Sequence, residues 1–169
     1  MIPYLVTPPV ELPVALSDMK LHLRAAHDDD DADIEAKQAG AVAMLDAWGG
    51  LLGRCIMPQA WAVDVTGPGP HLLPFPDASD VTAEGPDGAL DVEVSRTGLG
   101  LCATVSDAGS DDDLSIQFVC GLPADRLPAA QSLVKLMVQR EYDVMAGSDY
   151  DAISRSIDAL IGALRWRRL

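Results

Sequence analysis

The chain has 169 residues, 49% of them hydrophobic, which suits one globular domain with an ordinary buried core. Its formal net charge is −14 at pH 7, and this acidity excludes binding of nucleic acid by phosphate neutralisation, which requires a basic face. No apolar run reaches the roughly 20 residues of a membrane span, and prolines interrupt the start of the chain where a signal peptide needs a helical apolar segment. We therefore expect a protein that is made in the cytoplasm and has no membrane association.

Four prolines within residues 1–15 predict an extended N-terminal arm, lying on the body of the protein or on a neighbouring molecule. The next segment predicts a short helix over residues 17–26, with Ser17 as its N-cap. Leu16 and Leu21 flank this cap at the spacing of a hydrophobic staple.

An acidic turn follows, and it is the first candidate site. It contains a run of four aspartates: Asp28, Asp29, Asp30 and Asp31. A calcium loop starting at Asp29 would place Ile34 where glycine is needed and Gly40 where a bidentate glutamate is needed. His27 beside the run is better interpreted as a surface histidine than as a metal ligand. We therefore predict a solvated turn without a metal, followed by a helix over residues 32–48.

Residues 55–119 have β character. Alternating and short apolar segments predict four or five antiparallel strands, with a hairpin turn at the Gly-Pro-Asp-Gly sequence of residues 85–88. These segments contain few aromatic residues, so we expect a small sheet that depends on the helices for burial. A second acidic loop near the end of this region carries three consecutive aspartates: Asp111, Asp112 and Asp113.

A third helix is predicted over residues 128–146, with Gly147 as its C-cap, and Ser148 begins a last helix. The predicted fold class is α+β and mainly helical, with a helical hairpin and C-terminal helices packed against a small antiparallel β portion. The chain then has three regions: an arm (1–15), a core domain (16–147) and a C-terminal helix with a basic end (148–169).

The end of the chain is the second candidate site, because three of the twelve basic residues lie within the last five positions. Tryptophan and arginine are enriched in interface hot spots, which favours a docking arm. Arginines at the end of a helix also complement its dipole, and both interpretations stay open. The residues of the predicted docking arm are Ile157, Leu160, Ile161, Leu164, Arg165, Trp166, Arg167 and Arg168.

The sequence contains no pattern typical of an enzyme. The three histidines lie in no metal-binding or triad-like motif, and no nucleophile elbow or phosphate loop is present. The three cysteines are an odd number without zinc-site spacing, so we expect reduced, mostly buried thiols. We therefore expect no catalytic activity, no cofactor and no metal.

Short motifs follow one another along the chain in this order: Leu21–Arg24 (LHLR), Leu52–Arg54 (LGR), Gln59–Trp61 (QAW), Gly121–Pro123 (GLP) and Glu141–Tyr142 (EY). This order resembles the head–tail connector (adaptor) proteins of long-tailed phages and of phage-derived gene transfer agents. The resemblance covers roughly Leu12 to Met145. Each motif is a packing signature rather than a chemical site, and the helix and basic end after Gly147 are additions to the pattern.

The resemblance implies a structural protein that forms a ring, expected to be twelve-fold in the particle, beneath the capsid portal. Its partners would be the portal, stopper or tail-completion proteins, and further copies of itself. The two acidic loops would face the channel or solvent, and DNA would pass without specific binding because a like-charged wall does not hold it. The protein would be made in the cytoplasm of the bacterial host and end at the head–tail junction.

One alternative from another class is a small acidic binding protein. Such a protein would either bind a metal through His27 and the neighbouring aspartates, or mimic a nucleic acid and occupy a basic site on another protein.

Overall fold

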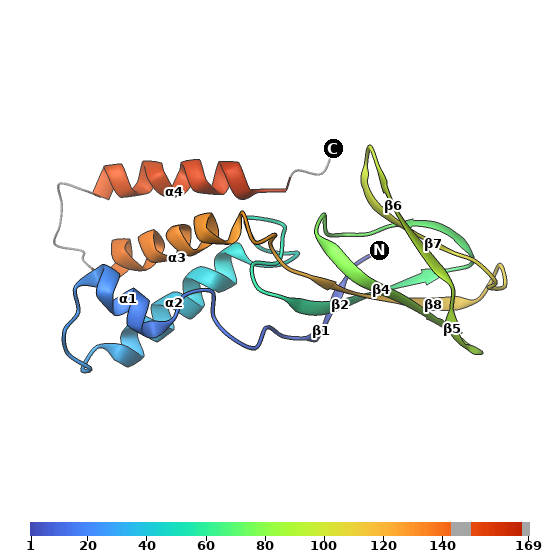
Figure 1. Cartoon of the computed structure of the whole chain (residues 1–169), viewed down its shortest axis with the longest axis horizontal. Helices are drawn as coiled ribbons and strands as arrows, with labels where there is room; N and C mark the ends of the chain where they lie inside the picture. Colours follow the sequence, from blue (N-terminus) through green and yellow to red (C-terminus); the bar gives the residue numbers. More distant parts are fainter. Residues whose placement is uncertain (143–149, 167–169) are drawn as a thin grey trace. The chain divides into compact units, whose positions relative to one another are not determined.

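A computed structural model describes residues 1–142 and 150–166 of the chain, and its described elements fall into two compact units (Figure 1). The β unit comprises residues 1–10, residues 57–122 and Trp166. The helical unit comprises the described residues of 11–56 and 123–165. Each unit has its own buried core, so each is described by itself.

The β unit contains two antiparallel sheets. Five strands form the first sheet in the order β1-β2-β8-β4-β5, and three form the second in the order β3-β7-β6. The strands are β1 (Tyr4–Thr7), β2 (Gln59–Thr66), β3 (Gly69–Leu72), β4 (Ala78–Gly85), β5 (Gly88–Leu90), β6 (Val92–Thr97), β7 (Gly100–Val105) and β8 (Asp113–Cys120).

The core of the β unit is built on the long ladder between β2 and β8. Trp61 lies opposite Phe118 in this ladder, and both side chains are buried. The ring of Phe75, from the segment between β3 and β4, packs between them at centroid distances of 5.2 Å from Trp61 and 6.0 Å from Phe118. These three tilted rings therefore form an aromatic cluster in the core of the β unit, although its segments contain few aromatic residues.

The helical unit is built around one helix. Its elements are α1 (Leu16–Leu23), α2 (Asp31–Leu45), α3 (Leu127–Tyr142) and α4 (Tyr150–Leu164). Helix α3 packs against each of the other three, and Figure 1 shows α4 lying alongside it. Its buried face recurs at helical spacing: Ala130, Leu133, Val134, Met137 and Val138. No helix in the described part of the chain combines the length and hydropathy required to cross a bilayer.

Two glutamines hold the proline-rich segment that precedes α1. The Gln38 side chain of α2, only 1% exposed, donates to the carbonyl of Val14 at 2.6 Å. The Gln131 side chain of α3 donates to the carbonyl of Pro13 at 2.8 Å. Because this segment belongs to no helix or strand, its carbonyls have no ladder partners, and these side-chain donors satisfy two of them.

The prediction of a mainly helical protein is wrong. Of the residues that the structure describes, 34% are helical and 30% lie in strands, which form two antiparallel sheets. Strand β1 lies within the predicted extended arm, and β3 covers part of Gly67–Pro70, whose glycines and prolines predict a turn, because short edge strands next to prolines carry little periodicity. The prolines around Leu72–Phe75 predict an edge or a crossing segment there, and in the structure β3 ends at Leu72 and residues 73–76 form a buried connection.

Three local predictions are also corrected. Helix α1 begins at Leu16 after Ala15, not after Ser17, and no side-chain cap is present. Leu21 is 80% exposed, so it forms no hydrophobic staple. All three cysteines are buried, but only Cys102 is a free thiol, since Cys55 and Cys120 are disulfide-bonded.

The difference between Ile34 and Leu21 gives a direct test of the helical core. Ile34 on α2 is fully buried, so Ile34→Ala should lower the free energy of unfolding by about 2–5 kcal/mol through lost burial and a residual cavity. Leu21→Ala removes the same kind of side chain from an exposed site and should change stability by less than about 0.5 kcal/mol. Urea denaturation of both variants measures the contrast, and equal losses would contradict this packing.

Candidate functional site

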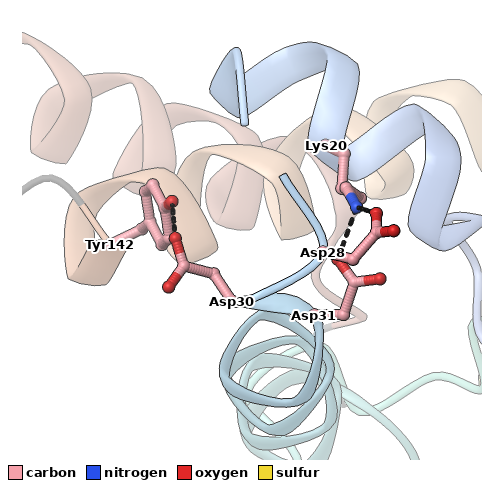
Figure 2. A network of polar contacts seen from close by, with 5 residues as sticks. All are labelled: Lys20, Asp28, Asp30, Asp31 and Tyr142. Atoms are coloured by element: carbon pink, nitrogen blue, oxygen red, sulfur yellow. Dashed lines mark hydrogen bonds and ion pairs between the residues drawn. The ribbon is translucent and has the colours of Figure 1, made fainter. Parts of the chain in front are cut away.

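The acidic turn between α1 and α2 is held by two side-chain donors that make three contacts (Figure 2). Lys20 Nζ lies 2.5 Å from Asp28 Oδ1 and 2.6 Å from Asp31 Oδ1. The hydroxyl of Tyr142, at the end of α3, donates to Asp30 Oδ2 at 2.6 Å. The turn is therefore fastened to both α1 and α3 through its own carboxylates.

These contacts shift two pKa values in opposite directions. The hydrogen bond from Lys20 lowers the pKa of Asp28, and donating hydrogen bonds to Asp28 and then to Asp31 raises the pKa of Lys20. The Asp28 side chain is 91% exposed, so water and salt screen its attraction to Lys20. The network positions the turn and contributes little to overall stability.

The carboxylates of the turn diverge instead of converging on one point. Asp28 and Asp31 turn toward Lys20, whereas Asp30 turns toward Tyr142 (Figure 2). Asp33 pairs with Lys37 one helical turn further along α2, at 2.5 Å. Within the described residues, no group of three or more histidine, cysteine, aspartate or glutamate side chains is placed to hold a metal ion.

The second acidic loop belongs to the β unit and is organised differently. Asp112 Oδ2 accepts a hydrogen bond from the backbone N–H of Gly109 at 2.7 Å, which closes the loop on itself. Asp111 is exposed, and Asp113 is the first residue of β8. Asp28–Asp30 and Asp111–Asp112 lie outside helices and strands as predicted, whereas Asp31 begins α2 and Asp113 begins β8. The sequence gave no indication that the two acidic loops belong to separate units.

The predicted docking arm is only partly exposed. Ile157 and Leu164 are each 3% exposed, whereas Leu160 and Ile161 are half-buried on α4. A buried arginine, Arg54, donates through Nη1 to the carbonyl of Leu164 at 3.2 Å and so caps the end of α4.

Beyond α4, Arg165 is exposed and Trp166 is half-buried. The indole of Trp166 lies beside Gly100 of β7, with 3.9 Å between its Cζ2 and the position that a Cβ would take on that glycine. Arg167 and Arg168 lie outside the described residues, as do Gly147 and Ser148.

Sequence reasoning missed an exposed apolar region at the start of the chain. We call it the N-terminal strip, and its members are Met1, Ile2, Tyr4, Leu5, Val6, Val10 and Leu12, all at least 42% exposed. Residues 1–10 contain no charged side chain, although the chain as a whole carries −14. That contrast was visible in the sequence, but prolines made the segment resemble a simple extended arm. Concentrated exposed apolar surface typically marks a contact region.

No protein-family model matches the chain, and no curated protein matches it. Among solved structures, the chain is similar to one described as "Neck of empty GTA particle computed with C6 symmetry". The two share 18% sequence identity at a TM-score of 0.67, over 100% of this chain and 97% of that one. At this identity the likeness shows a shared fold across the whole chain.

The network around Lys20 predicts a specific pH dependence. Because the pKa of folded Asp28 is lowered from 3.8, the pair stabilises the protein above that pH and is lost as pH falls through the lowered value. On the alkaline side, the contribution of Lys20 is complete below 10.5 and is lost as pH rises through its raised pKa.

Asp28→Asn should therefore lower Tm slightly near pH 7, with no difference from the unsubstituted protein at about pH 2 or in about 1 M salt. Asp29→Asn removes the same charge from the same turn, at a residue with no ion pair among the described contacts, and serves as the control. Thermal unfolding followed by circular dichroism measures both variants. An Asp28→Asn difference that persists at low pH would contradict the ion-pair origin.

Proposed function

We propose that this chain is a structural head–tail connector of a phage-like particle, at the neck between the capsid and the tail. The observation that carries this proposal is the shared fold with a chain from a gene transfer agent neck, which extends over the whole of this chain. The order of short motifs from Leu21–Arg24 to Glu141–Tyr142 supports it independently, because it points to the same class of protein from sequence alone.

In this proposal the chain forms a ring with further copies of itself beneath the portal. The similar structure was computed with six-fold rotational symmetry, which requires repeated contacts around one axis. A twelve-fold ring that matches the portal is the arrangement expected from the resemblance. The ring would extend the DNA channel and offer its far surface to stopper or tail-completion proteins.

The charge distribution supports a role beside DNA without binding it. Residues 57–122 contain eleven acidic residues and a single basic one, Arg96. A surface of that sign repels phosphates, so DNA would slide past the acidic loops at Asp28–Asp31 and Asp111–Asp113 without adhering. The same acidity favours the second candidate function, an acidic mimic of nucleic acid that occupies a basic site on another protein.

The C-terminal end is the proposed contact with the portal. Arg165 is exposed and follows directly on α4, whose position is set by the buried Ile157 and Leu164. In this arrangement the four apolar residues Ile157, Leu160, Ile161 and Leu164 orient the helix, and the basic residues beyond it reach an acidic or grooved portal surface. Trp166 is the apolar anchor among them.

Particle composition tests the proposed function. Particles produced in the host and purified by density gradient should contain the protein at the head–tail junction, detectable by antibody labelling in electron microscopy. Deleting the gene should yield filled or partly filled heads without tails, and supplying it in trans should restore tailed particles. A protein that stays in the soluble lysate, with tailed particles formed normally without it, would favour the nucleic-acid mimic.

The docking role of the basic end gives a separate prediction. Replacing Arg165, Arg167 and Arg168 together by serine should reduce the yield of tailed particles at least about tenfold, since arginine contacts at interface centres typically carry about 2 kcal/mol or more. The matched control removes three arginines of the helical unit, Arg126, Arg140 and Arg155. Both triple variants should keep a near-normal Tm. Tailed particles in normal yield from the first variant would exclude the docking role.

A further inference from the structure

Strand β1 ends the five-stranded sheet and has an open edge. Among the strands that the structure describes it pairs only with β2, and all four of its residues are exposed. Open strand edges present unpaired backbone donors and acceptors, and proteins normally protect them with charges. Here the strand itself contributes members of the N-terminal strip, of which Leu5 and Val6 are each 45% exposed, and no charged side chain occurs before Glu11. An unprotected apolar edge of this kind is suited to accept a strand from another chain.

Strand β6 ends the three-stranded sheet and has the second open edge. Within the described part of the chain it pairs only with β7, and five of its six residues are exposed, the exception being half-buried Val92. Val94 is 42% exposed, and Leu99, in the turn that follows the strand, is 68% exposed. Arg96 on this strand is the single basic residue of the segment 57–122, and none of the described ion pairs involves it.

The two edges differ in charge, and this difference decides whether they suit a head-to-tail contact or a two-fold contact between copies. A closed ring requires a head-to-tail contact, in which each copy contributes two different surfaces, whereas a two-fold dimer uses one surface twice. Edge β1 is apolar, and the neighbouring strand β2 places Asp64 on its exposed side, where Tyr4 donates to it at 3.1 Å. Edge β6 carries the unpaired Arg96. Two β1 edges offer no opposite charges to each other, whereas β1 and β6 do.

We propose that the open β1 edge of one copy accepts the open β6 edge of a second copy of this chain, with Arg96 of the second copy facing Asp64 of the first. This inference rests on the proposed function, since it assigns the ring contact that a neck protein needs. The register of β1 against β2 shifts between Leu5 and Thr7, so the added ladder is short and runs along the first part of β1. Its strength comes mainly from burying the N-terminal strip, repeated around the ring.

Cysteine cross-linking within assembled particles tests the contact. Particles are made with the double variant Tyr4→Cys and Val94→Cys, which lie on the same sheet face as Asp64 and Arg96 respectively, and with each single variant, then oxidised and analysed on non-reducing gels. The unsubstituted protein is the background control, because its free thiol, Cys102, is buried. The double variant should give a ladder of covalent multimers that collapses on reduction, whereas each single variant should stay monomeric.

The outcomes separate this inference from the proposed function. A protein located at the neck whose double variant forms no multimers overturns the β1–β6 contact and leaves the neck role intact. Dimers from Tyr4→Cys alone would indicate a two-fold contact between β1 edges, which also overturns it. A protein absent from particles removes the neck role and this inference together.

A charge substitution gives an independent readout with a matched control. Leu5→Lys places a strongly hydrated charge in the N-terminal strip and should reduce incorporation into particles at least about tenfold. Leu21→Lys makes the same change at an 80% exposed residue of α1 and should incorporate normally. Circular dichroism should show both variants folded. Equal incorporation of the two folded variants would contradict the proposed contact.

Discussion

Burial around one continuous stretch of chain, from β8 to α3, is the constraint on which the rest of the structure depends. Strand β8 is bordered by β2 and β4 and is therefore central in its sheet, with Leu114, Ile116 and Phe118 buried along one face. Helix α3 follows it in sequence and is the helix on which α1, α2 and α4 all pack. Each unit thus forms its core on one half of this stretch, residues 113–142. The other elements are placed by what they bury against it.

Buried polar side chains and exposed acidic side chains have different roles in this protein. Polar side chains with low exposure, such as Gln38 and Arg54, are used to satisfy backbone carbonyls at the ends of irregular segments and helices. The acidic residues lie mainly on the surface, where they repel phosphates and other copies of the chain. Assembly of such an acidic chain requires contact regions without net negative charge. The residues of the N-terminal strip up to Val10 and the strand that carries Arg96 are two such regions in the β unit.

The candidate sites differ in how far the sequence could define them. The acidic turn at Asp28–Asp31 was recognisable from its composition, and the mismatched calcium positions already argued against a metal. Its fastening to Lys20 and Tyr142 was not recognisable, because Tyr142 lies more than a hundred residues away in the chain. The apolar stripe of α4 was likewise visible as a helical pattern. Its burial against α3 and its cap from Arg54 depend on tertiary packing.

The sequence by itself determined the four helices of the described residues to within a few positions, most of the strand segments, and the acidic character of the surface. Local periodicity, turn residues and charge counts carry that information because each acts between near neighbours. Only the tertiary structure decided that β structure rivals the helices, since short edge strands such as β1 and β3 acquire their identity from the strand they pair with. It also decided which apolar residues are core and which are surface: Ile34 and Leu21 look alike in the sequence, but only Ile34 faces neighbouring elements that bury it.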